Sequence, residues 1–140
     1  HDTRMNLALA YRLKATDYIQ ALRLRGRICR HFAEALQKVD ALVTPATACT
    51  AGEIRSDALK TGDSDLPLLD KIMRFAPVAN LTGLPAVSFP AGYDGQGLPI
   101  GFQAIGRPFE ENLLLRISRV GEGLLERKAP KFHRKLLVEG

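Results

Sequence analysis

Serine is the residue type in this chain with the clearest capacity for covalent chemistry. Serines occur at positions 56, 64, 88 and 118, and nucleophilic catalysis would need one of them beside a base and beside donors for an oxyanion. None has a Gly-rich neighbourhood or a base nearby in the sequence. Ser88, within PAVSFPAG, is the strongest candidate, but its setting favours a buried strand serine that bonds to backbone. We therefore predict no catalytic residue in this chain.

Histidine and cysteine form only a weak metal-binding pattern. Cys29 and His31 make a C-x-H pair within a helical pattern, and they lie about 200° apart around a helix axis, so they cannot hold one ion together. Cys29 is expected to be a buried thiol. The glycines at 92, 95, 97 and 101 are spaced for turns rather than for a phosphate-binding loop. We predict no metal and no organic cofactor.

Composition indicates one modest domain and argues against a nucleic-acid partner. The chain has 140 residues, 46% hydrophobic and 25% charged, with a net charge of +5. Its basic residues cluster at 23–30 and after 126, acidic residues lie between these clusters, and no aromatic residues interleave with the arginines. We expect solvated helix faces, and peripheral membrane association stays open. Two cysteines make no disulfide framework, which favours an intracellular location without identifying a compartment.

Helical patterns dominate the first forty residues. Composition favours a helix over residues 1–15, and Thr16 is a candidate N-cap for a longer helix that Asp40 ends. Apolar residues recur in this helix at three- and four-residue steps, which predicts an amphipathic face that packs on a substantial partner. That face consists of Tyr18, Leu22, Cys29, Phe32, Leu36 and Val39. The following run 41–44, closed by Pro45, predicts a buried parallel strand.

The middle of the chain predicts a surface loop and then a second helix. The polar stretch 49–65 is the loop. Asp65 can cap the helix, and Pro67 near its start costs little. Pro77 would kink or end this helix. One helical face carries Leu69, Ile72, Met73 and Ala76.

Turn chemistry predicts a β-hairpin after residue 85. Residues 86–89 form an apolar run that predicts a buried strand, stopped by Pro90. YDGQG at 93–97 is typical of a tight turn. Residues 99–105 then predict a strand that pairs back antiparallel on the previous one.

A final helix completes an α/β pattern of helices packed on a few strands. Acidic residues at 110 and 111 favour the first turn of this helix, because the helix dipole stabilises negative charge there. Its predicted buried face consists of Leu114, Ile117, Val120, Gly121 and Leu124. Alternating helices and short strands place the chain in the α/β class.

Two motifs between Arg74 and Glu111 carry a family resemblance. NLTGLPAVSFPAG and GLPIGFQAIGRPFEE together resemble the carboxy-terminal part of amidase signature proteins, and MRF before ANLTG resembles the plant-type fatty acid amide hydrolases. The resemblance covers about residues 18–126. It implies that residues 1–140 are the carboxy-terminal part of a single amidase domain, with a basic, loosely ordered tail at 127–140. His1 in place of Met leads us to expect further sequence before it.

The resemblance also implies a fold, a reaction and a set of site residues. The fold would be part of an α/β/α layered amidase domain around a mixed sheet. The reaction would be hydrolysis of carboxylic amides, with fatty acid amides such as N-acylethanolamines as substrates and no cofactor. The family's Ser-Ser-Lys triad has no counterpart in this chain, so we expect the chain alone to be inactive. The expected substrate wall consists of Leu69, Ile72, Met73, Thr47 and Leu84, with plain core packing as the alternative role for each.

Two other functions remain open at this point. The amidotransferase component that amidates glutamyl-tRNA has the same closing motifs, although MRF argues mildly against it. A non-catalytic interaction module could instead use the basic helix and tail to hold an acidic protein, an anionic membrane or RNA. The expected partners are the small-molecule amide, the amino-terminal part of the same domain and, as an open alternative, a second copy of the chain.

Overall fold

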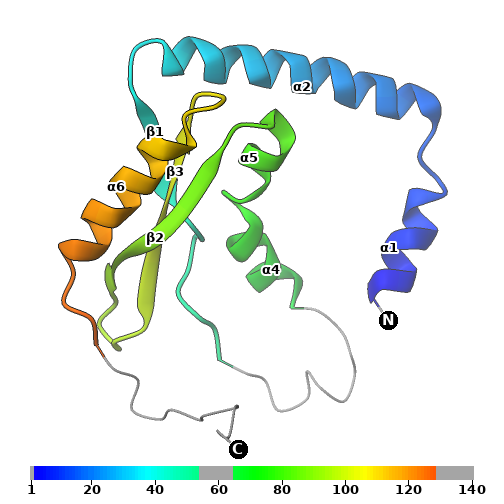
Figure 1. Cartoon of the computed structure of the whole chain (residues 1–140). Coiled ribbons are helices and arrows are strands. Elements are labelled where there is room, and N and C mark those ends of the chain that lie inside the picture. Colours follow the sequence, from blue (N-terminus) through cyan, green and yellow to red (C-terminus); the bar gives the residue numbers. More distant parts are fainter. Residues whose placement is uncertain (1, 54–64, 129–140) are drawn as a thin grey trace, which may run out of the picture.

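The computed structural model describes residues 2–53 and 65–128. It has the predicted α/β composition, with helices placed around a small sheet (Figure 1). The elements in chain order are α1 (Asp2–Ala10), α2 (Ala15–Leu36), β1 (Ala41–Pro45), α4 (Leu66–Met73), α5 (Pro77–Thr82), β2 (Ala86–Tyr93), β3 (Pro99–Gly106) and α6 (Glu111–Gly123).

The sheet has the strand order β1-β3-β2, and both described pairings are antiparallel. The prediction of a buried parallel strand at 41–45 is therefore wrong, because β1 runs antiparallel to β3 and lies at one edge. Of the mixed sheet that the resemblance implied, the described strands form antiparallel pairs only. Thr44, Gln103 and Ser88 lie opposite one another across the three strands, so their side chains share one face.

The predicted hairpin of β2 and β3 is confirmed, but β2 is longer than expected. It continues through Pro90 to Tyr93, with a register irregularity between Pro90 and Gly92. A proline is tolerated there because β2 is an edge strand and the irregularity relaxes the hydrogen-bonding ladder. The turn that follows is fixed by Asp94, whose carboxylate accepts hydrogen bonds from the backbone N–H groups of Gln96 and Leu98, both at 2.9 Å.

The hairpin turn gives a testable dependence on pH. The Leu98 N–H, then the Thr50 hydroxyl, and then the other turn N–H groups lower the pKa of Asp94 below its ordinary 3.8. A carboxyl with a lowered folded-state pKa adds stability above its unfolded pKa and loses it as pH falls through the folded value. We expect Asp94→Asn to lower the urea midpoint at pH 7, with the gap to wild type narrowing below pH 3.8.

Asp70→Asn is the matched control for the turn, because Asp70 makes an exposed ion pair with Arg74 and no turn contact. Exposed ion pairs contribute little to stability. Circular dichroism across the pH series measures both variants. Equal urea midpoints for Asp94→Asn and wild type at neutral pH would contradict the role of the turn.

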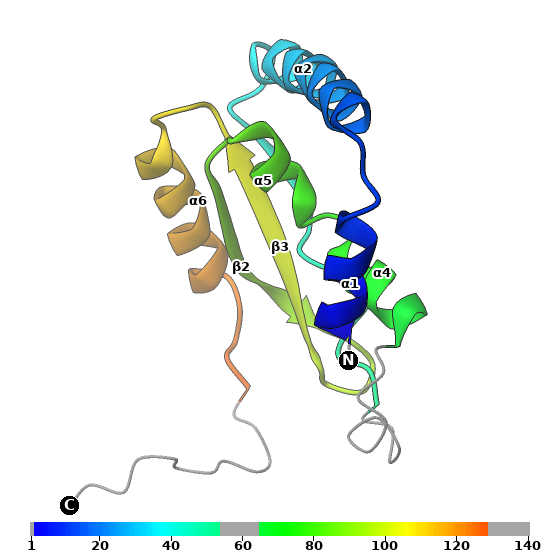
Figure 2. The same ribbon diagram turned by 90° about the vertical axis from the view of Figure 1, so that its right-hand side faces the viewer.

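Helices cover both faces of the sheet (Figure 2). On one face α6 packs against β2, where Gly121 lies against the ring of Phe89. On the other face Gln103 reaches the junction of α4 and α5, where its Nε2 donates to the carbonyl oxygen of Phe75 at 3.5 Å. The buried apolar side chains are Leu36, Ala79, Ala104, Ile105 and Leu114.

The predicted buried face of α6 is correct only in part. Leu114 is buried, and Ile117 and Gly121 are half-buried. Val120 and Leu124 are exposed, contrary to prediction: Val120 lies about 100° around the helix from Gly121, which contacts the sheet, and Leu124 follows the last residue of α6. A periodic apolar pattern marks a face that can be buried, but it does not say how much of that face this chain covers itself.

The helices at the start of the chain have slightly different ends from those predicted. Residues 2–10 are helical, as composition favoured. The long helix starts at Ala15 rather than after a Thr16 cap, and the Asp17 carboxylate accepts from the Lys14 backbone N–H at 2.9 Å. It ends at Leu36, before Asp40. Cys29 is half-buried rather than fully buried.

The predicted cap of α4 is confirmed, and the second helical segment is separate. The Leu68 N–H donates to Asp65 Oδ1 at 3.0 Å, and a proline stands in the first turn. Pro77 begins the new helix α5 instead of kinking or ending α4, which ends at Met73. That helix ends at Thr82 and is capped by Gly83, whose φ of 76° is a left-handed conformation that glycine adopts without strain. Residues 54–64 of the predicted loop and 129–140 of the predicted tail lie outside the described residues.

Candidate functional site

Backbone hydrogen bonds join the segment after β1 to β3 and to the last turn of α4. The Ala46 N–H donates to the carbonyl oxygen of Gly101 at 2.8 Å, and the Ala48 N–H donates to that of Lys71 at 2.9 Å. Gly52 lies so close to Leu68 that an added Cβ would stand 3.0 Å from its side chain. Thr47 is therefore held beside α4, with its hydroxyl donating to the Cys49 carbonyl at 2.7 Å.

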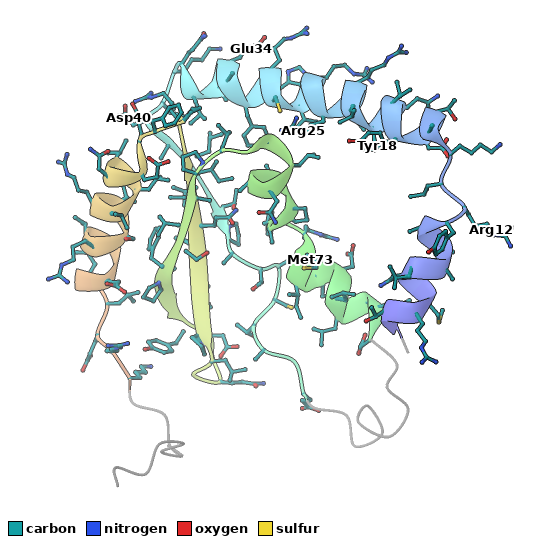
Figure 3. The ribbon with its side chains drawn as sticks, turned by 45° about the vertical axis from the view of Figure 1, so that its right-hand side comes forward. Arg12, Tyr18, Arg25, Glu34, Asp40 and Met73 are labelled. Atoms are coloured by element: carbon teal, nitrogen blue, oxygen red, sulfur yellow. The ribbon has the colours of Figure 1, made fainter. Side chains whose placement is uncertain are left out.

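Three apolar residues of α4 form what we call the apolar strip: Leu69, Ile72 and Met73. Their steps of three and four place them on one helical face. Their exposed fractions are 43%, 40% and 47%, although each is a large hydrophobic side chain. Met73 lies at the junction of α4 and α5 (Figure 3). Thr47 lies in the segment whose backbone bonds to Lys71 on the same helix.

Leu84 lies apart from the other four predicted wall residues. It follows Gly83, and the next carbonyl, that of Pro85, accepts from the Gly106 N–H at 3.0 Å. The Thr47 segment instead meets β3 at Gly101. Five residues of extended strand separate these two points, which is about 17 Å. The structure thus places the segment that contains Thr47 against α4, the helix that carries the apolar strip, and places Leu84 at the other end of β3.

Leu84 lines a separate pocket of about 470 Å³ between α2, the end of α5 and the turn before α6. Beside this pocket, two side chains of α2 contact the carboxyl end of α5. Arg25 Nε donates to the Leu81 carbonyl at 2.6 Å, and the Cys29 thiol lies 3.8 Å from the Thr82 carbonyl. The pocket is lined by Cys29, Ala33, Leu36, Gln37, Thr82, Leu84, Arg107, Pro108 and Glu110.

Arg107 joins three elements at the rim of this pocket, and the sequence pattern did not single it out. Its Nε donates to Glu110 at 2.8 Å, its Nη1 to the carbonyl of Leu36 at 3.0 Å, and its Nη2 to Asp40 at 3.2 Å. The bond to Glu110, followed by that to Asp40, raises the pKa of Arg107 above its usual value. The spacing of three residues between Arg107 and Glu110 was the available sequence signal for their ion pair. The contact with Leu36 joins residues that lie 71 positions apart.

The described serines have surroundings that do not suit a nucleophile. Ser88 is exposed on β2, so the expectation that it is buried is wrong. The Ser118 hydroxyl donates to the Leu115 carbonyl on its own helix. Within residues 2–53 and 65–128, no serine hydroxyl is hydrogen-bonded to a lysine or histidine. Ser56 and Ser64 lie outside the described residues.

The described residues show neither a metal-binding cluster nor a helix suited to a bilayer. No group of three or more His, Cys, Asp or Glu side chains among them could hold an ion. None of the described helices combines the length and apolar character needed to cross a membrane. The apolar strip, together with the Thr47 segment that bonds to α4, is the candidate site.

Two solved structures share this arrangement of helices and strands. A glutamyl-tRNA(Gln) amidotransferase subunit from Thermotoga maritima matches with a TM-score of 0.65 and 32% identity, over 84% of this chain and 24% of its own. A 6-aminohexanoate cyclic dimer hydrolase complexed with substrate matches with a TM-score of 0.60 and 25% identity, over 78% and 23%. Both contain the same helix and strand layers within a larger protein.

The sequence comparison identifies the family. The family model described as Amidase matches residues 2–115. The chain therefore belongs to the amidase family, as its closing motifs implied.

Curated relatives are much longer than this chain. A fatty acid amide hydrolase from Medicago truncatula is 49% identical over 124 residues, which are 89% of this chain and 20% of that protein. A glutamyl-tRNA(Gln) amidotransferase subunit from Picosynechococcus sp. is 42% identical over 121 residues, which are 84% and 22%. The chain spans about one fifth of the length of the curated relatives it matches.

Proposed function

We propose that this chain forms part of an enzyme that hydrolyses fatty acid amides and that it supplies one wall of the acyl-binding site. The apolar strip on α4 is the observation that carries the proposal. Three large hydrophobic side chains lie half-exposed on one helical face, beside a segment fixed by backbone hydrogen bonds. Such a surface suits an acyl chain, because each methylene removed from water is worth about 0.8 kcal/mol.

The relatives support a fatty amide over a glutamyl-tRNA substrate. Identity reaches 49% with the Medicago fatty acid amide hydrolase and 47% with one from Oryza sativa. It is 42% with the amidotransferase protein of Picosynechococcus sp.. An apolar wall also fits a hydrocarbon tail better than it fits a nucleic acid, whose recognition depends mainly on cationic and stacking groups.

The chain's own part in this reaction is to bind and orient substrate. The described serines lack a base partner. The acyl-enzyme chemistry would therefore take place on the other four fifths of an amidase as long as the curated relatives. The apolar strip would hold the acyl tail and exclude water from it, and Thr47 would stand at the polar end. Binding a remote part of the substrate in a fixed position raises the rate at the reacting amide.

Met73→Lys tests this role in a chimera in which this chain replaces the aligned segment of the Medicago enzyme. We expect kcat/KM for a long-chain N-acylethanolamine to fall about tenfold, because contact with about two methylenes is lost. A short-chain amide should lose much less, since it does not reach the strip. The ratio of the two kcat/KM values is the measurement.

Leu115→Lys is the matched control for the chimera, since Leu115 is an exposed apolar residue on α6, away from the strip. It should leave the ratio unchanged. Equal losses for both amides in Met73→Lys would contradict an acyl-binding wall.

We also expect the 140-residue chain alone to release no product. Turnover by this chain that Ser88→Ala abolishes would contradict our assignment of the chemistry. Co-purification with a tRNA-dependent partner would favour the amidotransferase alternative.

A further inference from the structure

The first half of α2 and all of α1 carry large apolar side chains that nothing in the described part of this chain covers. Every residue from 3 to 27 is exposed. The exposed set includes Met5, Leu7, Leu9, Tyr11, Leu13, Tyr18, Ile19, Leu22 and Leu24. A helix in a protein owes most of its stability to packing of an amphipathic face, so a partner for this region is missing.

One face of α2 shows where that partner would bind. Tyr18, Leu22, Arg25 and Cys29 follow one another at steps of four, three and four, so they share a face. At Arg25 and Cys29 this face contacts the end of α5. At Tyr18 and Leu22 the same face extends past α5 and is exposed. Figure 3 shows Tyr18 and Arg25 on this inner side of α2 and Glu34 on the opposite side.

The charge distribution on α2 favours a protein on the inner side. Arg23, Arg27 and Arg30 project from the opposite side of the helix, between about 100° and 180° from the Tyr18–Cys29 face. An anionic membrane or RNA would contact that outer, cationic surface. The inner face instead contacts α5 at Arg25 and Cys29, and Leu36 at its far end is buried. The exposed part of the face is therefore continuous with a part that already packs against protein.

We propose that the inner face of α2, extended by α1, docks on the remaining four fifths of an amidase chain. This inference rests on the proposed function and names its partner. The same fold occupies only 24% of the Thermotoga protein, at a TM-score of 0.65. In that protein about three quarters of the polypeptide lies outside the matched part. The helix α2, about 33 Å long, is the main contact surface.

Co-expression with the Medicago enzyme lacking its aligned segment tests the docking. The complex is measured by co-elution and by its dissociation constant, without reference to activity. We expect Leu22→Asp to weaken binding at least tenfold and Leu24→Asp to change it by less than about twofold. These leucines are similarly exposed, at 45% and 50%, but lie about 200° apart on the helix.

Each outcome of this experiment decides the docking proposal. No complex with the wild-type chain, or equal effects of the two substitutions, would overturn it. A homodimer of the chain alone that Leu22→Asp dissociates would assign the face to a second copy instead. A complex that forms but cleaves no amide would leave the docking intact and count against the proposed function.

Thermal unfolding of the single-chain chimera provides a second measurement that does not require the truncated enzyme to fold. In this chimera Leu22→Asp should lower the Tm and Leu24→Asp should not. Equal Tm values for the two variants would overturn the docking even if the separate fragments bind.

Discussion

Leu114→Ala is expected to lower the free energy of unfolding of the chain by about 2–5 kcal/mol, the range typical of a buried leucine truncated to alanine. Leu114 is 2% exposed and fills the space where α6 approaches β3. An added Cβ on Gly106 would stand 3.1 Å from Leu114 Cδ2, so the two residues fit each other closely. Alanine would leave a cavity beside Gly106, in a core with few buried apolar side chains among the described residues. Because the chain has no tryptophan, urea unfolding followed by far-ultraviolet circular dichroism is the measurement.

The next residue on the helix is the control for this prediction. Leu115 is 62% exposed, and Leu115→Ala should change stability by no more than about 0.5 kcal/mol. Gly106→Ala should cost less in the Leu114→Ala background than in wild type, because the close contact is gone. If Leu114→Ala and Leu115→Ala have similar effects, α6 does not pack on the sheet through Leu114.

Gly121→Ala is the second substitution with a large expected effect. An ideal Cβ at this position would stand 2.6 Å from Phe89 Cδ2 and 2.7 Å from Cε2. The Phe89 ring cannot move aside freely, because it packs edge-on against Phe102 with centroids 6.3 Å apart. Overpacking of this kind costs about 1–3 kcal/mol, which the better helix propensity of alanine offsets by at most about 1 kcal/mol. Urea unfolding should show a net loss of stability.

Gly123→Ala, on the same helix, is expected to have the opposite sign. Nothing lies within 4 Å of a Cβ added at Gly123, so only the helix propensity changes and stability should rise by up to about 1 kcal/mol. The pair separates the contact with Phe89 from the general effect of removing a glycine. Stabilisation by both substitutions would mean that α6 lies farther from β2 than the Gly121–Phe89 contact requires.

Local sequence signals predicted the elements well and their pairing only where the partners are close in sequence. The Asp94 turn and its two strands were predictable because a short loop determines an antiparallel hairpin. The Asp65 cap was predictable for a similar reason, since its bond to the Leu68 N–H spans three residues. The pairing of β1 with β3 joins residues about sixty positions apart, and no local pattern encodes it.

In the candidate site, too, local sequence predicted the features within one helix and missed those that depend on distant parts of the chain. Periodicity alone placed the apolar strip on one face of α4. It could not show that Leu84 lies at the other end of β3, because that separation depends on how the sheet is assembled. The contacts of Arg107 with Leu36 and Asp40 were out of reach for the same reason.

The strand order has a consequence for self-association. With β3 in the centre, β1 and β2 each have one long side whose backbone groups are unpaired among the described strands. Exposed strand edges are templates for adding a further strand, including one from another molecule. Proline has no N–H to donate, and Pro45 ends β1 while Pro90 interrupts β2. These prolines shorten the continuous rows of backbone donors along both edges, which limits strand addition in aggregation or in a larger sheet.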